Sequence, residues 1–387
     1  MTTNAARLEE KILKVFTGSN FAVSAVVVIF GFLTATVLLF IIGRNPAGMY
    51  QAILQVVTGF DSRRGTWNVR YTGEWLVTAI PLILCGLSFA FSARSGLFNI
   101  GAEGQYIAGL TAAQFIAVTF VKVPVLHLFA AVTGAMFAGA LWGAVCGFFK
   151  ARYRVSEVVS TIMMNYIAFY LHRIITLRIP GTSTIRTVEF HLTSSLASPM
   201  LSSLTNGSRL NMGLWLTIAA IIAYWLVMEK TTLGYSLRAA GFNRDAALYA
   251  GMRVKTNITT AMAISGAFAG LAGACVSLGV FSYGRVLSAF DNYGFDGIAV
   301  ALGGSCTAAG VAVMGLLFGM LKSAQPLMQS RQIPQEIASI IMGLVVVFLA
   351  LRSGIYMFAQ WRKKERLRRG IEPNDDRLTG RSADGSN

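Results

Sequence analysis

Residues 258–281 read ITTAMAISGAFAGLAGACVSLGVF, a run without a single charged side chain. A helix rises about 1.5 Å per residue, so about 20 apolar residues are enough to cross the hydrocarbon core of a bilayer. Gly266 and Gly270 are four residues apart and share one face of this helix, with the GxxxG spacing that lets two membrane helices pack closely. The run therefore predicts a membrane-spanning helix whose glycine face contacts another helix.

The composition of the whole chain is that of a membrane protein. Of the 387 residues, 55% are hydrophobic and 13% are charged, whereas soluble domains carry about 25% charged residues. A water-soluble globule cannot hide that much apolar surface, which excludes the soluble, disordered and fibrous classes. The four Cys and three His are scattered along the chain, so the sequence predicts neither a disulfide framework nor a metal site.

Further apolar runs predict an all-α integral membrane protein with about ten membrane segments. The runs 296–306 and 309–325 are short, and they form either two crossings or one re-entrant hairpin. Segments 76–179 and 258–352 each hold four spans and begin at opposite faces, so they are candidates for two inverted halves. The predicted segments are 21–42, 76–93, 105–121, 125–149, 155–179, 212–228, 258–281, 296–306, 309–325 and 335–352.

Lysine and arginine indicate the topology. The net charge is +16, and cytoplasmic loops of membrane proteins collect basic residues, so the charge needs no nucleic-acid partner. If both termini are cytoplasmic, 21 of the 33 Lys and Arg fall in inner segments. The outer loops 43–75 and 180–211 carry fewer of them per residue. We therefore expect a multi-pass protein with its N-terminus and C-terminus in the cytoplasm.

The chain divides into three parts. We expect a cytoplasmic segment over 1–20, a transmembrane domain over 21–352 and a basic, disordered cytoplasmic tail over 353–387. The apolar run 21–42 is longer than the core of a signal peptide, so we interpret it as a first span. The outer loop 180–211 is rich in Ser and Thr and is either a connector or a docking surface.

Polar side chains within apolar segments are candidates for the lining of a translocation path, because such groups face a bundle interior or water. The stretch GLFNIGAEGQ, residues 96–105, joins two spans, and its three glycines allow an irregular backbone. The alternatives are a solvated turn or a helix cap and, for Asn165, an interhelical hydrogen bond. The candidates are Phe98, Asn99, Glu103, Gln105, Asn165, Tyr166, Asn292, Tyr293, Phe295 and Asp296.

The cytoplasmic segment 229–257 contains a short predicted helix. Asn243 suits the N-cap, Asp245 falls in the first turn, and Gly251 can end the helix in the left-handed conformation. Such a short helix is marginal alone in water, so it suits docking to another subunit, the alternative being an amphipathic helix on lipid. The chain lacks a GK dipeptide and hence a P-loop, so we expect it not to hydrolyse ATP.

Five ordered stretches resemble the permease subunits of bacterial ATP-binding cassette (ABC) importers for branched-chain amino acids, simple sugars and nucleosides. The resemblance covers residues 75–360 and is closest to the nucleoside branch, which works with a lipoprotein receptor of the basic-membrane-protein type. The stretches are GLFNIGAEGQ (96–105), EVVSTIMMNYIA (157–168), SLRAAGFNRDAALYAGM (236–252), SGAFAGLAGA (265–274) and YGFDGIAVALGG (293–304).

The resemblance implies the partners of this chain. Such permeases lie in the bacterial inner membrane and work in pairs, either identical or related. Each one docks an ABC ATPase subunit, which holds ATP and Mg²⁺, through a short cytoplasmic coupling helix, and an extracytoplasmic substrate-binding lipoprotein delivers the substrate. The coupling-helix motif falls on Asn243, Arg244, Asp245, Ala246, Ala247, Leu248, Tyr249 and Gly251.

The sequence thus predicts the permease of an ABC nucleoside importer that works by alternating access. The candidate lining combines amides with aromatic rings, which suit a ribose and a flat base, and it has no adjacent cations to bind a phosphate. Simple sugars and branched-chain amino acids are alternative substrates. Two rivals from other classes are an ion-coupled secondary transporter and a membrane-bound enzyme. Carboxylates that mostly lie at helix ends argue against the first, and the lack of a His/Cys constellation argues against the second.

Overall fold

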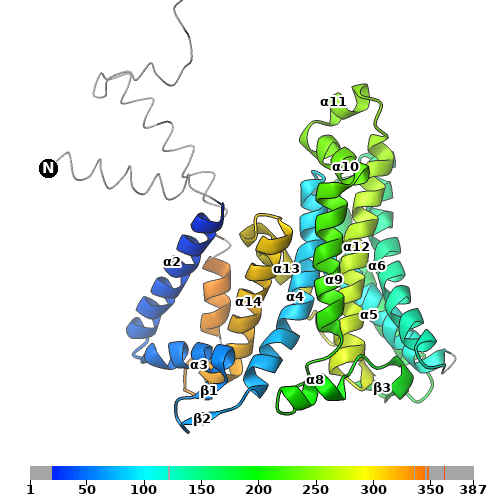
Figure 1. Ribbon diagram of the computed structural model, residues 1–387. Coiled ribbons are helices and arrows are strands. Elements are labelled where there is room, and N and C mark those ends of the chain that lie inside the picture. The colour runs from blue at the N-terminus through cyan, green and yellow to red at the C-terminus, as the bar shows by residue number, and fades with distance from the viewer. Residues whose placement is uncertain (1–19, 121–122, 335, 345–346, 348–360, 362–387) are drawn as a thin grey trace, which may run out of the picture.

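The computed structural model describes residues 20–120, 123–334, 336–344, 347 and 361. In this part of the chain the fold is a bundle of helices of unequal length (Figure 1). The predicted segment 1–20 and the tail 353–387 lie almost entirely outside the described residues, and the last predicted span, 335–352, lies partly outside them.

In chain order, the helices and strands of the described residues are divided here into a first group that ends at Glu189 and a second group that begins at Leu192. The first comprises α2 (Asn20–Ile41), α3 (Ala47–Thr58), β1 (Phe60–Asp61), β2 (Thr66–Trp67), α4 (Arg70–Arg94), α5 (Ala102–Thr119), α6 (Leu126–Tyr153), α7 (Glu157–Leu177) and β3 (Arg186–Glu189). The second comprises η1 (Leu192–Ser194), α8 (Pro199–Leu204), α9 (Gly213–Trp225), the π-helical turn η2 (Leu226–Lys230), α10 (Thr232–Phe242), α11 (Arg244–Tyr249), α12 (Val254–Val280), β4 (Tyr283–Arg285), α13 (Tyr293–Gly303) and α14 (Ala308–Gln329).

Six helices among the described residues are long and apolar enough to cross a membrane, and they coincide with six predicted segments. They are α4, α6, α7, α9 with η2, α12 and α14. The apolar helix Val27–Ile41 is shorter than these. α5 carries Glu103, Gln105 and Gln114, which lower its hydropathy, and α13 has only 11 residues. The prediction of about ten membrane segments is therefore confirmed only for six.

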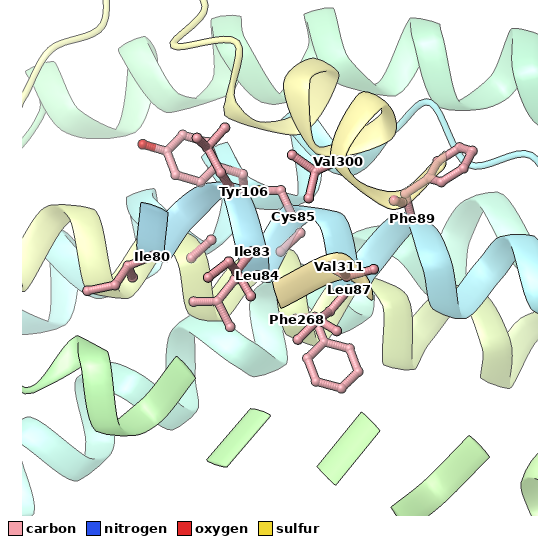
Figure 2. Close-up of a cluster of buried hydrophobic side chains, with 14 of the residues drawn as sticks. Ile80, Ile83, Leu84, Cys85, Leu87, Phe89, Tyr106, Phe268, Val300 and Val311 are labelled. Carbon is pink, nitrogen blue, oxygen red and sulfur yellow. The ribbon is translucent and has the colours of Figure 1, made fainter. Parts of the chain in front are cut away.

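α4 and α12 form the centre of the bundle. In the most apolar 18-residue stretch of each helix, 83% of the residues of α4 and 72% of those of α12 are buried. The corresponding shares are 22% for α6 and 28% for α7. A helix that is apolar on all sides belongs in the interior. A Cβ atom on Gly86 of α4 would lie 2.9 Å from both Val300 of α13 and Val311 of α14, which are among the buried side chains labelled in Figure 2. α6 and α7 instead expose large apolar side chains, which suits contact with lipid or another membrane subunit.

Glycines let α6 and α12 touch backbone to backbone. A Cβ atom on Gly139 of α6 would lie 2.2 Å from the carbonyl O of Gly266, and one on Gly270 would lie 2.3 Å from the carbonyl O of Ala135. The close-packing face predicted at Gly266 and Gly270 is therefore confirmed, and its partner is α6.

The short elements gather at the two ends of the bundle (Figure 1). α10 and α11 lie at one end, whereas α3, α8 and the short strands lie at the other. β3 pairs with β4 in an antiparallel ladder that places Arg186 opposite Arg285 and Glu189 opposite Tyr283. The predicted outer loop 180–211 is therefore structured, and it is tied to the segment that follows α12.

Two connections fold back into the bundle instead of staying at its ends. After α4, Asn99 donates a hydrogen bond to Ser265 (2.8 Å), which lies in the interior of α12, so α5 begins inside the bundle. After α12, the chain returns in the same way to the start of α13. There a Cβ atom on Gly294 would lie 2.2 Å from the backbone N of Glu103. The N-termini of α5 and α13 therefore meet within the fold.

We expect Gly266→Ala to destabilise the bundle, because the new Cβ atom would lie 2.1 Å from the carbonyl O of Gly139. Forcing the two backbones apart costs roughly 1–3 kcal/mol, measured as a lower melting temperature of the purified protein. Gly343→Ala is the control, since a Cβ atom there meets no described atom within 4 Å. Equal melting temperatures for the two variants would contradict this prediction.

Candidate functional site

The same six-residue pattern, Asn-X-Gly-X-acid-Gly, accompanies the start of both internal helices. It reads NIGAEG at residues 99–104, where α5 begins, and NYGFDG at residues 292–297, where α13 begins. The two copies are the segments that meet inside the bundle. Both stretches were selected from the sequence as candidates, but the repeat that relates them was missed, although it is visible in the sequence.

Asn99 is the centre of a buried network that holds the first copy in place. Its side-chain amide donates to Ser265 Oγ (2.8 Å) and to Gln105 Oε1 (3.1 Å), and its Oδ1 accepts from the N–H of Gly101 (2.9 Å). The Ser265 hydroxyl in turn donates to the carbonyl O of Ser88 on α4 (2.7 Å). The polar groups of α4, α5 and α12 therefore satisfy one another at this point.

Asn165 of α7 binds the backbone at the start of α5. Its Oδ1 accepts from the N–H of Gly104 (2.8 Å), and its Nδ2 donates to the carbonyl O of Ile100 (3.1 Å). Asn165 thus makes the interhelical hydrogen bond that the sequence left open as an alternative. The path candidates that are fully buried against this chain's own atoms are Asn99, Glu103, Gln105 and Asn165. Their role in lining a path stays a prediction.

The remaining candidates lie nearer to the surface of α7 and α13. Tyr166 is 50% exposed, and its ring centroid lies 5.3 Å from that of Phe290, which lies 6.1 Å from that of Phe295. We call these three rings the aromatic face. Asn292 and Phe98 are also exposed. Phe290 was missed because it stands alone in the loop before the second motif copy, yet it joins the rings of α7 and α13.

Two ion pairs surround the start of α13. Arg285 Nη2 lies 2.5 Å from Asp291 Oδ2, which also accepts the hydroxyl of Tyr106 (2.7 Å). Lys322 Nζ on α14 lies 2.5 Å from Asp296 Oδ2. Charges inside a membrane bundle are costly unless they are paired. Both cations were missed in the sequence, because a lone Lys or Arg beside an apolar run does not reveal which carboxylate it will bind.

Tyr293, the first residue of α13, packs between these pairs. Its ring centroid lies 5.7 Å from that of Tyr106 and 4.9 Å from Lys322 Nζ. An ammonium near an aromatic ring is attracted by the electrons of that ring. Tyr293 is thereby held against α5 and α14 and is only partly exposed.

The segment predicted to dock another subunit forms the short helix α11 at one tip of the molecule (Figure 1). Asn243 Oδ1 accepts hydrogen bonds from the N–H groups of Asp245 (3.1 Å) and Ala246 (3.0 Å). Gly251 follows the helix with φ of +79°, in the left-handed region that glycine tolerates best. Both predicted ends of this helix are therefore confirmed.

The side chains of α11 divide into one buried anchor and an exposed surface. Ala247 is buried, whereas Leu248 is exposed and Tyr249 is 93% exposed. Phe242, which ends α10 beside it, is also almost fully exposed. An apolar patch of this kind in water marks a surface for contact with a protein or a membrane. Arg244 is exposed at the start of the helix.

Comparison with known proteins shows similarity to membrane permeases over most of the chain. A family model described as a branched-chain amino acid transport system permease component matches residues 71–350. The guanosine ABC transporter permease protein NupP of Bacillus subtilis is 39% identical over 348 residues, which are 89% of this chain and 98% of that protein. The nucleoside ABC transporter permease protein NupB of Lactococcus lactis is 35% identical and covers 85% of this chain and 90% of its own length. A glucose ABC transporter permease protein of Haloferax volcanii is 34% identical over 71% of this chain and 75% of its own length.

We expect Lys322→Met to lower the melting temperature of the protein, because it leaves Asp296 without its partner in a largely buried pair. Breaking a fully buried pair costs about 3–5 kcal/mol, and we expect a smaller loss here because the two side chains are 19% and 27% exposed. The double variant with Asp296→Asn should recover most of the loss, since no charge is then left unpaired. Arg209→Met, which breaks the more exposed pair with Glu74, should have a smaller effect. A double variant no more stable than Lys322→Met would contradict the pairing.

Proposed function

This chain belongs to the family of branched-chain amino acid transport system permease components, and we propose that it is the membrane-spanning subunit of an ABC importer for nucleosides. The membership confirms the resemblance found in the sequence. The observation that carries the substrate class is similarity, over nearly the whole length, to permeases named for guanosine and for nucleosides. The relative named for glucose makes simple sugars the second candidate.

The aromatic face suits a nucleoside, which joins a flat base to a ribose. Aromatic rings stack on bases of any kind, and amides such as that of Asn292 can bind sugar hydroxyls. The basic side chains around the start of α13, Arg285 and Lys322, already bind carboxylates. Two neutralised cations are poorly suited to holding a phosphate, which favours nucleosides over nucleotides.

A second permease, identical or related, would close the path over the aromatic face. Tyr166 is exposed on α7, one of the six candidate membrane spans, and Asn292 is exposed at the start of α13. Polar groups there are better placed against protein or a water-filled path than against lipid. Alternating access would open this path first to one side of the inner membrane and then to the other.

The repeated motif supports the prediction that 76–179 and 258–352 are inverted halves. In each, a long central helix, α4 or α12, leads into a connection that folds back into the bundle, and a motif copy follows at the start of α5 or α13. α5 and α13 begin at the same place and leave it in opposite directions. Discontinuous helices whose N-termini meet near the middle of a bundle are typical of transporters built from inverted repeats.

We place the end with α10 and α11 in the cytoplasm, together with both termini. Basic residues collect there, including Lys150 and Arg244, which line one cavity of about 110 Å³. The opposite end, with α8, β3 and β4, would then face outward and receive a lipoprotein that carries the substrate. α11 would dock the ATPase subunit that binds ATP and Mg²⁺, with Leu248 and Tyr249 as its contact surface.

Uptake of labelled guanosine, adenosine, uridine, ribose and leucine, in cells with and without this chain, tests the substrate. We expect nucleoside uptake to depend on the chain. Phe290→Leu should lower that uptake several-fold, because it removes the central ring of the aromatic face. Phe137→Leu on the exposed side of α6 is the control and should have no effect. Dependence of ribose or leucine uptake alone would overturn the nucleoside assignment.

We expect Gly251→Pro to abolish transport while the protein still inserts into the membrane. Proline fixes φ near −65° and cannot adopt the +79° of Gly251, and it removes the N–H that bonds to the carbonyl O of Leu248 (3.0 Å). Gly251→Asn is the matched control, because Asn tolerates left-handed φ. Receptor-dependent uptake and ATPase activity of the assembled complex are the measurements. Normal uptake by the Pro variant would exclude α11 as the coupling element.

A further inference from the structure

The carboxylate of Glu103 joins the two motif copies. Glu103 lies in the first turn of α5 and is fully buried. Its Oε1 accepts from the N–H of Asn292 (2.9 Å), and its Oε2 accepts from the N–H of Gly294 (2.6 Å). These donors belong to the N-terminus of α13, where the first N–H groups of a helix have no acceptor within the helix.

The two backbones are in direct contact at this point. A Cβ atom on Gly294 would lie 2.2 Å from the backbone N of Glu103 and 2.5 Å from its Cα. Only glycine fits such an approach. Asn292, one of the two donors, has φ of +64°, so the chain turns sharply into α13 just where the carboxylate holds it.

One turn further along α5, Tyr106 holds the same segment. Its hydroxyl donates to Asp291 Oδ2 (2.7 Å), and its ring packs against Tyr293 with centroids 5.7 Å apart. The first two turns of α5 therefore contact every residue from 291 to 294. This segment immediately precedes Phe295, which belongs to the aromatic face.

The acid of the second motif copy, Asp296, does not bind the N-terminus of α5 in the way that Glu103 binds the N-terminus of α13. Asp296 binds Lys322, and the N–H of Gly101 in the first copy is taken by Asn99 Oδ1. Of the two acids in the motif copies, Glu103 is therefore the one whose side chain binds the other half of the described chain, from 76–179 to 258–352. The link between the two internal helices is asymmetric: α5 supplies both the carboxylate of Glu103 and the side chain of Tyr106, whereas Asp296 of α13 binds Lys322 on α14.

We propose that Glu103 is a positioning residue for transport, which fixes the N-terminus of α13 and with it the place of Asn292 and Phe295 on the path. Its buried carboxylate acts through the backbone of α13 and does not touch the substrate. The uptake part of the test rests on the proposed function, whereas the exchange part does not.

The test compares Glu103→Gln with Gln114→Leu in the full-length protein. The Gln variant keeps the size of the side chain but loses one of the two acceptor oxygens. Gln114 is equally buried on the same helix, but it donates to Thr176 on α7 (2.7 Å) and makes a matched control. Tyr106→Phe removes only the hydrogen bond from the Tyr106 hydroxyl to Asp291 and leaves the Arg285–Asp291 pair, so it is a milder second variant in case Glu103→Gln fails to insert.

Amide hydrogen exchange of the peptide 292–303 is the first measurement. Loss of one of the two hydrogen bonds that the side chain accepts should speed its exchange by up to about ten-fold in Glu103→Gln, and by less in Tyr106→Phe. Exchange in α12 should stay as in the parent. Unchanged exchange at 292–303 would overturn the proposal, and so would faster exchange throughout the bundle, which would indicate a general loss of structure.

Uptake kinetics of the assembled importer are the second measurement. A positioning role predicts a several-fold lower maximal rate with an unchanged KM, and parent-like values for Gln114→Leu. A higher KM at an unchanged maximal rate would make Glu103 a substrate contact, and parent-like kinetics in Glu103→Gln would remove it from transport. If the parent itself takes up no nucleoside, the proposed function fails, and the exchange measurement still decides whether Glu103 holds α13.

Discussion

The N-termini of α5 and α13 face each other inside the bundle, and their free N–H groups must find acceptors there, because a membrane interior supplies no water to bind them. Glu103 meets this requirement for α13, and Asn99 and Asn165 meet it for the loop and first turn of α5. The burial of Asn99, Glu103 and Asn165 follows from that one constraint. The surrounding helices supply the apolar enclosure in which such bonds are strong.

This constraint divides the candidate path residues into those that satisfy backbone groups and those that remain exposed. The amides and the carboxylate that satisfy backbone groups are buried, whereas the aromatic face and Asn292 reach the surface in front of them. Asn292 belongs to both groups, because its backbone N–H is held by Glu103 while the residue is exposed. The surface that we propose for the substrate would thereby rest on a layer of buried hydrogen bonds, which is how proteins hold a binding site in shape.

Much of this arrangement was predictable from the sequence, but which side chain binds which partner was not. Uninterrupted apolar runs predicted the spanning helices, and cap residues predicted α11, because both are local properties of the chain. Polarity within apolar segments pointed to Asn99, Glu103 and Asn165. It could not tell a side chain that satisfies the backbone from one that meets a substrate, because both are polar residues in the same stretch. Lys322 and Phe290 were missed, since their partners lie elsewhere in the chain.

The glycine contact between α6 and α12 has a consequence for the genetics of this protein. Where side chains pack against side chains, an enlarged residue can often be rescued by a smaller one opposite. Gly139 and Gly266 meet backbone against backbone, and neither has a side chain left to shrink. Second-site suppressors of a substitution there cannot arise across the contact. Selection for restored function would have to recover true revertants or changes that move a whole helix.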